Sequence, residues 1–154
     1  LIVPYIADIQ RIAISIADYE ERMFHLSVKT KKVIDYLQQS PAVKEVYSVL
    51  HPSSKANFEK MCAYPQALPG VVSVVFNKPL AYYYDILALP KGPSFGASFT
   101  LAMPYVYLAH YDLVTSQDGR KQLQEMGLHP ELLRISVGTE PVEAILSVFK
   151  NAGI

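Results

Sequence analysis

The sequence contains a single cysteine, Cys62, among its 154 residues, so no internal disulfide can form. Such low cysteine usage is typical of a reducing compartment, and we expect a cytoplasmic protein. No run of about 18 apolar residues occurs, which argues against a membrane-spanning helix. The 14 Lys plus Arg residues balance the 14 Asp plus Glu residues, so the basic excess that favours nucleic acid is missing. We therefore expect neither a membrane nor a nucleic acid as a partner.

Signals for secretion are also missing from the first residues. The opening LIVPYIADIQ has no basic segment and no small-residue cleavage site, as a signal peptide would. The chain begins with Leu1 rather than a methionine, and we expect it to be a fragment of a larger protein.

Common catalytic and metal-binding motifs are not found. The sequence has no glycine-rich nucleotide-binding loop and no nucleophile elbow. Its four histidines do not have the spacing of metal ligands, so we expect no metal site (His25, His51, His110, His129). His110 is expected to have a structural role. The lysines of SVKTKKV lie beside one another on an amphipathic segment, whereas a Schiff-base lysine needs a desolvated pocket; they are expected to face solvent (Lys29, Lys31, Lys32).

What is present predicts one compact domain, because 51% of the residues are hydrophobic. An apolar stripe with 4-3-4-3 spacing from Tyr5 to Leu37 predicts one long helix within residues 1–40, ending before Ser40-Pro41. Strands are predicted at 43–49, 71–76, about 99–102 and 132–138. Helices are predicted at about 53–62, with Ser53 or Ser54 as its cap, and at 77–87, 117–126 and 139–149. This order predicts an α+β domain at 41–154: a mostly antiparallel sheet of about four strands, with helices on one face.

The last predicted strand, LLRISVG, carries an arginine between apolar residues. Because side chains alternate between the two faces of a strand, Leu133, Ile135 and Val137 should face a core. Arg134 and Ser136 should then share the opposite face. One interpretation is a guanidinium that reaches water or pairs with a nearby carboxylate. The other is a receptor for a carboxylate or phosphate, which the guanidinium fork fits bidentately.

A second candidate feature is the turn GPSFG, which contains Ser94. A serine among turn residues exposes its hydroxyl and neighbouring backbone N–H groups, which is one way in which proteins hold small anions. The same residues could simply form a connection. If the turn lies beside Arg134, Ser94 and Arg134 would together form a clamp for a carboxylate.

Two stretches carry a resemblance to a known family. KGPSFGASFTLAMPYVYLAHY followed by LLRISVGTEPVEAIL resembles the C-terminal domain of the Cys/Met-metabolism enzymes, the pyridoxal-phosphate (PLP) enzymes of transsulfuration. The segment ERMFHLSVKTKKVIDYLQQSPAVKEVYSV resembles the helix that links their two domains, and the first strand after it. The features are most similar to those of cystathionine γ-synthase, and cystathionine or methionine lyase is the alternative within the family.

The resemblance implies specific roles for three residues. Arg134 matches the arginine that pairs with the α-carboxylate of the substrate, and Ser94 matches the serine beside that carboxylate. Pro93 occupies a place where many members carry a residue that gates substrate choice. The sequence departs from the family turn, which normally has a second glycine followed by Glu-Ser (here Ala97, Phe99 and Thr100).

For the complete protein, the resemblance implies a PLP-dependent γ-replacement on an activated homoserine by a thiol such as cysteine. It also implies an N-terminal large domain and a homotetramer. The Schiff-base lysine and the other PLP-binding motifs belong to that large domain and do not occur in this sequence. The resemblance therefore implies that this chain holds no catalytic and no cofactor-binding residue and is inactive alone. The contrasting hypothesis is a non-catalytic α+β module that binds a small acid or a partner protein.

Overall fold

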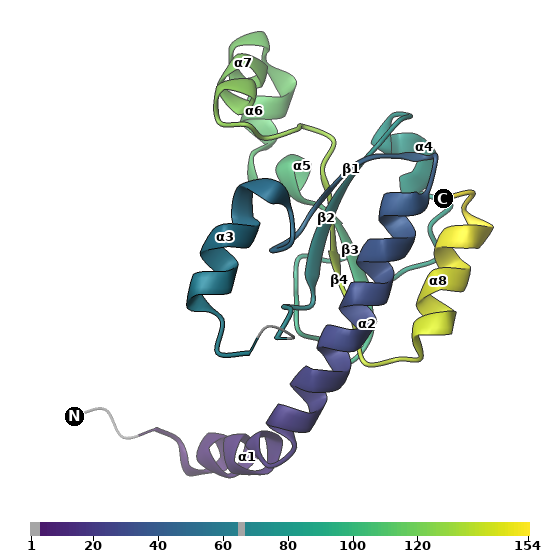
Figure 1. Ribbon diagram of the computed structural model, residues 1–154. Coiled ribbons are helices and arrows are strands. Elements are labelled where there is room, and N and C mark those ends of the chain that lie inside the picture. The colour runs from purple at the N-terminus through teal and green to yellow at the C-terminus, as the bar shows by residue number, and fades with distance from the viewer. Residues whose placement is uncertain (1–3, 65–66) are drawn as a thin grey trace.

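The computed structural model describes residues 4–64 and 67–154, which form a four-stranded sheet with helices around it (Figure 1). Its strands are β1 (Val43–Tyr47), β2 (Val71–Phe76), β3 (Leu101–Pro104) and β4 (Leu133–Ser136). Its helices are α1 (Ile6–Ile16), α2 (Tyr19–Gln39), α3 (Pro52–Met61), α4 (Leu80–Tyr84), α5 (Tyr105–Ala109), α6 (Tyr111–Thr115), α7 (Gln117–Glu125) and α8 (Val142–Asn151).

The sheet confirms the predicted α+β class. Its strands lie in the order β1-β2-β4-β3, and each neighbouring pair is antiparallel. β2 is rich in valine, and β-branched side chains of this kind fit a pleated, half-buried surface. β4, the last strand in sequence, lies between β2 and β3 and so occupies an interior position in the sheet.

The main core lies between one face of the sheet and the helices α2 and α8, which run side by side across it (Figure 1). α8 buries residues at helical spacing, Val142, Ile145 and Phe149. Where the two helices meet, the Tyr36 and Phe149 rings stack with their centroids 6.3 Å apart. Together these contacts pack α2 and α8 against each other and against one face of the sheet.

The opposite face of the sheet carries a smaller cluster. Val75 of β2 packs there with Val106 of α5, and with residues of α6 and α7 (Val114 and Leu123). The long helices α2 and α8 therefore share one face, as predicted, while short helices between β3 and β4 cover part of the other.

The single long helix expected within residues 1–40 is corrected to two helices. α1 ends at Ile16 and α2 begins at Tyr19, and residues 1–3 of the expected segment lie outside the described residues. The Asp18 backbone leaves the helical region, with φ −108° and ψ 12°. Across the break, Arg22 contacts the Asp18 carboxylate and donates to the Ser15 carbonyl oxygen at 2.9 Å. α1 consequently points away from the sheet (Figure 1).

Two smaller expectations are also corrected. The third strand lies at Leu101–Pro104 rather than at about 99–102, and the stretch after it, where no helix was predicted, forms α5 and α6. The cap of α3 is His51 rather than Ser53 or Ser54, because the His51 ring accepts a hydrogen bond from the Ser53 backbone N–H.

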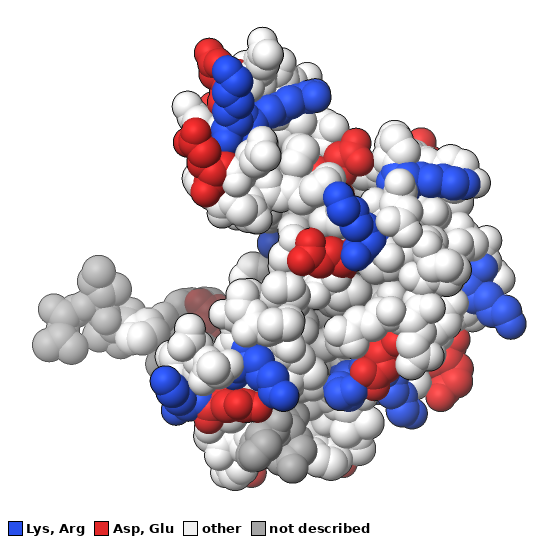
Figure 2. All heavy atoms as spheres, turned by 45° about the horizontal axis from the view of Figure 1, so that its top comes forward, with Lys and Arg blue, Asp and Glu red and all other residues white. Residues whose placement is uncertain are grey.

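Acidic and basic side chains are interspersed on the face of the molecule that Figure 2 shows. This mixture agrees with the net charge of zero. Within residues 4–64 and 67–154, no helix is both long enough and apolar enough to span a membrane.

Candidate functional site

Arg134 lies at the centre of the sheet. It pairs with Ser73 of β2 on one side and with Met103 of β3 on the other. Its neighbours in sequence, Leu133 and Ile135, are fully buried in the core beneath α2 and α8. The predicted alternation is confirmed, and it directs the Arg134 side chain to the opposite face of the sheet.

The turn at 93–96 meets the Arg134 guanidinium. Arg134 Nη2 donates to the Pro93 carbonyl oxygen, and also to that of Ser94 at 3.3 Å. The structure thus brings Arg134, Pro93 and Ser94 together, although it does so through backbone carbonyls rather than through the Ser94 hydroxyl. Among the described residues, Nη1 and Nε of Arg134 have no hydrogen-bond partner. The roles of Arg134, Ser94 and Pro93 toward a substrate remain predictions.

Two aromatic rings flank the same guanidinium. The Arg134 Cζ atom lies 5.6 Å from the centroid of the Phe95 ring and 5.8 Å from that of Tyr105. Both distances are within the range of a cation–π attraction, which restrains the guanidinium without using its N–H donors. Neither ring was predicted from the sequence, because only the docked turn brings Phe95 to β4, and Tyr105 begins a helix that was not predicted.

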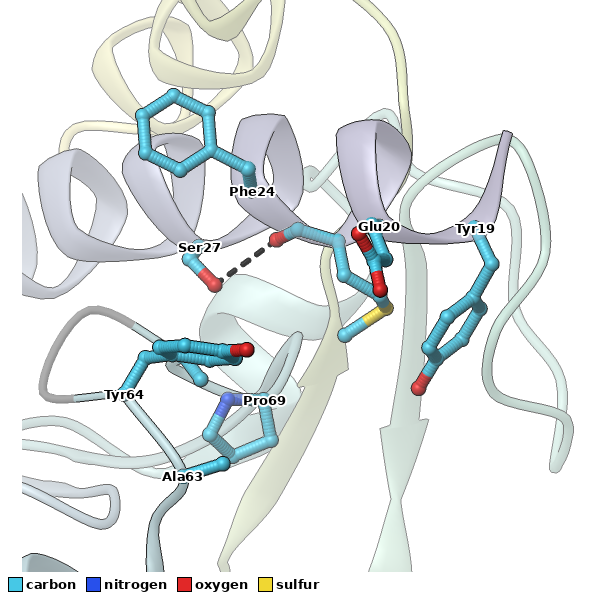
Figure 3. A pocket seen from close by; sticks show the side chains of 9 residues that line it. Tyr19, Glu20, Phe24, Ser27, Ala63, Tyr64 and Pro69 are labelled. Carbon is cyan, nitrogen blue, oxygen red and sulfur yellow. Dashed lines mark hydrogen bonds between the residues drawn. The ribbon is translucent and has the colours of Figure 1, made fainter. Parts of the chain in front are cut away.

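A groove of about 600 Å³ lies apart from Arg134, along the N-terminal half of α2 (Figure 3). Tyr19 and Phe24 of α2 line it, and Tyr64 and Pro69 face them from the segment before β2. Ser27, at its base, donates hydrogen bonds to the Met23 carbonyl at 2.9 Å and to the Leu68 carbonyl at 3.0 Å. Among the described residues its lining is mostly apolar, and the titratable groups in it are the Glu20 carboxylate and the phenols of Tyr19 and Tyr64.

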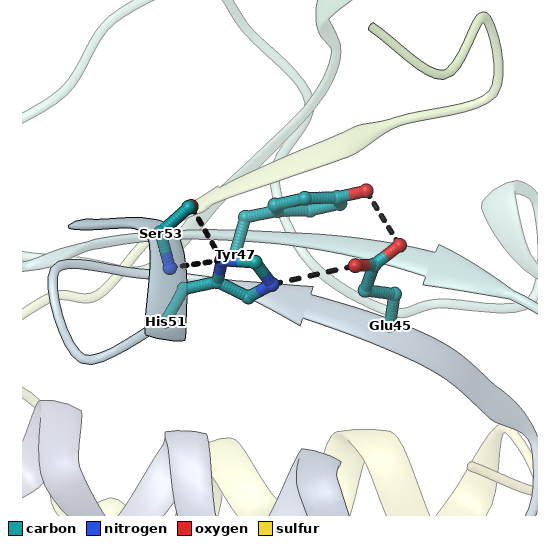
Figure 4. A network of polar contacts seen from close by, with 4 residues as sticks. All are labelled: Glu45, Tyr47, His51 and Ser53. Carbon is teal, nitrogen blue, oxygen red and sulfur yellow. Dashed lines mark hydrogen bonds and ion pairs between the residues drawn. The ribbon is translucent and has the colours of Figure 1, made fainter. Parts of the chain in front are cut away.

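A polar network that was not predicted from the sequence links β1 to the start of α3 (Figure 4). The Tyr47 hydroxyl donates to Glu45 Oε2 at 2.5 Å, and His51 Nε2 lies 3.3 Å from Glu45 Oε1. The other ring nitrogen, Nδ1, accepts from the Ser53 backbone N–H at 3.4 Å and lies 2.7 Å from Ser53 Oγ. A backbone N–H can only donate, so His51 carries its proton on Nε2, toward Glu45.

This network has a consequence for Tyr47. The hydrogen bond to Glu45, then burial, then the negative charge of Glu45 raise the pKa of Tyr47 to about 12. The phenol therefore stays neutral and continues to donate to Glu45 across the whole physiological range. The period-two spacing of Glu45 and Tyr47 could have indicated that their side chains share a face of the strand. The contact of His51 with Glu45 depends on the turn after β1, which the spacing does not indicate.

The remaining candidates do not assemble into a catalytic group. Among the described residues, no cluster of three or more His, Cys, Asp or Glu could hold a metal ion. His110 stands edge-on to Tyr105, with ring centroids 5.9 Å apart. Every lysine lies within the described residues and none is buried, so none occupies the desolvated pocket that a Schiff-base amine requires. Among the described residues, no lysine is therefore placed as a Schiff base with PLP requires.

Comparison with known proteins gives relatives over nearly the whole chain, although no model of a protein family matches it. The chain is 41% identical to the L-2-amino-4-chloropent-4-enoate dechlorinase/desaturase of Streptantibioticus cattleyicolor, over 97% of this chain and 30% of that protein. It is 33% identical to the cystathionine gamma-synthase of Neurospora crassa, over 88% of this chain and 21% of that protein. The chain thus spans less than a third of the length of the curated relatives it matches.

Solved structures show the same fold. A putative O-acetylhomoserine (thiol)-lyase of Campylobacter jejuni, determined with pyridoxyl-lysine monophosphate, superposes with a TM-score of 0.72. The superposition covers 88% of this chain and 32% of that one, at 21% sequence identity. The predicted small-domain fold is confirmed by this likeness.

Proposed function

We propose that this chain, which belongs to the cystathionine γ-synthase-like group of PLP-dependent transsulfuration enzymes, is the C-terminal domain and forms the substrate-facing part of such an enzyme. The resemblance seen in the sequence is confirmed by these relatives. In this proposal Arg134 binds the α-carboxylate of an amino-acid substrate, with Ser94 beside it and Pro93 at the gate. The complete protein carries out γ-replacement on an activated homoserine by a thiol such as cysteine, and cystathionine or methionine lyase activity is the alternative.

The observation that carries the proposal is the guanidinium held between a sheet and a turn. Its Nη2 is engaged by the carbonyls of Pro93 and Ser94, while Nη1 and Nε have no partner among the described residues. An arginine oriented in this way offers N–H donors in a fixed geometry to a carboxylate. Holding the substrate by its carboxylate sets the position of the reacting carbons and makes the reaction effectively intramolecular.

The names of the relatives support a substrate class. The 4-chloro group of one named substrate and the acetyl ester of the other both place a leaving group on the γ-carbon of an α-amino acid. Both substrates keep the free carboxylate that Arg134 would bind. We therefore assign the full-length enzyme an L-α-amino acid with a leaving group at the γ-carbon.

In this proposal the cofactor belongs to the rest of the protein, because no lysine among the described residues is placed as a Schiff base with PLP requires. PLP supplies the electron sink that such reactions need. The contribution of this chain is to bind and orient the carboxylate, and the chain alone is inactive.

We propose the N-terminal large domain as a partner of this chain, with residues 1–40 linking the two domains. This rests on the relatives, which are more than three times as long, and on exposed apolar residues of α1 such as Ile12 and Ile16. The complete protein would be a homotetramer. The lone Cys62, which is a free thiol, supports a reducing compartment such as the cytoplasm.

The test is Arg134→Ala in the full-length enzyme. We expect KM for the amino acid to rise at least tenfold, since losing a charged partner costs roughly 2–5 kcal/mol, while the absorbance spectrum of the bound cofactor stays normal. Arg120→Ala, which removes the same charge from the surface of α7, is the matched control and should leave KM unchanged. An unchanged KM in Arg134→Ala would end the carboxylate role. Saturable binding of an amino acid by the isolated chain would instead favour a binding module.

A further inference from the structure

The loop that carries the 93–96 turn is tied down at both of its ends. At the first end the Gly92 N–H donates to the Ala102 carbonyl at 3.1 Å. At the second, the backbone N–H and the hydroxyl of Thr139 both donate to the Ser98 carbonyl, each at 2.9 Å. These bonds fix the ends of the loop but leave the position of the turn between them undetermined.

Within the turn, β4 supplies the contacts. Ser136 lies two residues after Arg134 and therefore on the same face of the strand. Its hydroxyl oxygen accepts a hydrogen bond from the Gly96 N–H at 3.2 Å, and the side chain is buried, with 3% of its surface exposed. Arg134 and Ser136 thus hold the two halves of the turn from neighbouring positions on one strand face.

Apart from this hydrogen bond, Gly96 makes few contacts among the described residues. Its φ is +75°, a conformation that glycine adopts readily, and no atom lies within 4 Å of the place where a Cβ would stand. Phe95 before it is 69% exposed. The described contacts therefore make the Ser136 hydroxyl the main anchor of this half of the turn.

We infer that Ser136 is a positioning residue for the substrate carboxylate, acting through the turn on Arg134. This inference rests on the proposed function. With Gly96 anchored, the carbonyls of Pro93 and Ser94 reach Arg134 Nη2, and Phe95 stands over the guanidinium. Without the anchor, the turn moves more freely, so that Arg134 loses its fixed direction and Ser94 its place beside the carboxylate. Ser136 itself does not touch the substrate.

The first test measures the anchor itself, by hydrogen exchange with mass spectrometry on the full-length enzyme. In Ser136→Ala we expect exchange in peptides covering residues 94–97 to become about 3- to 10-fold faster, the range for one lost hydrogen bond. Ser73→Ala is the matched control. Ser73 of β2 is the cross-strand partner of Arg134 and lies on the same face of the sheet, and no hydrogen bond of its hydroxyl occurs among the described residues. This substitution should leave that exchange unchanged.

The second test measures the consequence for binding. Ser136→Ala should raise KM for the amino acid about 3- to 10-fold, with kcat changed less than twofold. Ser136→Thr keeps the hydroxyl and should restore most of the lost affinity. A merely structural role would not produce rescue by the hydroxyl together with a change confined to KM.

The outcomes separate the two proposals. Faster exchange with an unchanged KM would overturn the positioning role of Ser136, and so would unchanged exchange in Ser136→Ala. In either case the carboxylate role stands if Arg134→Ala still raises KM. If Arg134→Ala has no effect on KM, the proposed function fails first, and the positioning role fails with it.

Discussion

At the scale of single residues, the chemistry of this chain is decided by what each polar side chain faces. Arg134 and Glu45 both lie on the strand face opposite α2 and α8, yet they meet different partners. Arg134 meets carbonyl oxygens and aromatic rings, which leave part of its fork open. Glu45 is engaged on both oxygens, by Tyr47 and by His51. Glu45 is therefore suited to a structural role and Arg134 to binding a ligand.

The Tyr47 phenol provides a test of that structural network. Its pKa is raised to about 12 in the folded chain, against about 10 when unfolded. A raised pKa stabilises the fold below pH 10, and the stabilisation is lost as the pH rises from 10 towards 12. We expect the tyrosinate absorbance of the native chain minus that of Tyr47→Phe to stay small up to pH 11. A full tyrosinate signal in that difference by pH 11 would contradict the Tyr47–Glu45 hydrogen bond.

At the scale of elements, the loop from β4 to α8 must pass very close to the loop before β3. A Cβ on Gly138 would stand 2.4 Å from the Phe99 carbonyl carbon and 2.2 Å from Glu140 Oε2. The Gly138 N–H also donates to Thr100 Oγ1 at 3.0 Å. This close approach keeps the end of the 92–100 loop against β4, where Arg134 and Ser136 lie.

Gly138→Ala should therefore destabilise the chain by about 1–3 kcal/mol, because a backbone must move to admit the methyl group. Chemical denaturation measures this as a lower free energy of unfolding. Gly92→Ala, in the same loop region, is the control: its new Cβ would lie 3.8 Å from Leu101, an ordinary contact. It should change stability by no more than about 0.5 kcal/mol. Equal effects of the two substitutions would argue against the close approach.

Prediction from sequence succeeded at this scale where a pattern repeats. The alternation in LLRISVG placed Leu133 in the core and Arg134 opposite, and the valines of β2 marked a buried strand. It failed where one residue interrupts a continuous pattern: the apolar stripe runs through Ala17-Asp18 without a change of period, although the helix breaks there. The meeting of the 93–96 turn with β4 depends on β3 pairing with β4, and no local pattern in the sequence encodes that pairing.

At the scale of the whole molecule, the chain has a well-formed core to which the helix α1 contributes no residue. No residue of α1 is buried, and its exposed side chains include Ile9, Ile12 and Ile16. Together with the groove beside Tyr19 and Phe24 (Figure 3), α1 offers an apolar surface of the kind that is normally covered in an assembly.

The isolated chain should therefore self-associate as its concentration rises. Ile12→Asp together with Ile16→Asp should reduce the association that sedimentation velocity detects, because two charges would enter the apolar surface. Lys44→Gln with Lys150→Gln, on β1 and α8, makes the same change in net charge outside α1 and is the control. A native chain that stays monomeric at high concentration would contradict the expectation of a covering domain.

The proposed function depends most directly on the contact between Arg134 and a carboxylate, and one comparison isolates that contact. The full-length enzyme and its Arg134→Ala variant should each be assayed with the amino-acid substrate and with the same compound as its α-carboxamide. If Arg134 binds the carboxylate, the native enzyme prefers the acid strongly in kcat/KM, and the variant loses at least tenfold of that preference, since the interaction is worth roughly 2–5 kcal/mol. An equal loss on acid and amide would show that Arg134 acts elsewhere and would contradict the proposed site.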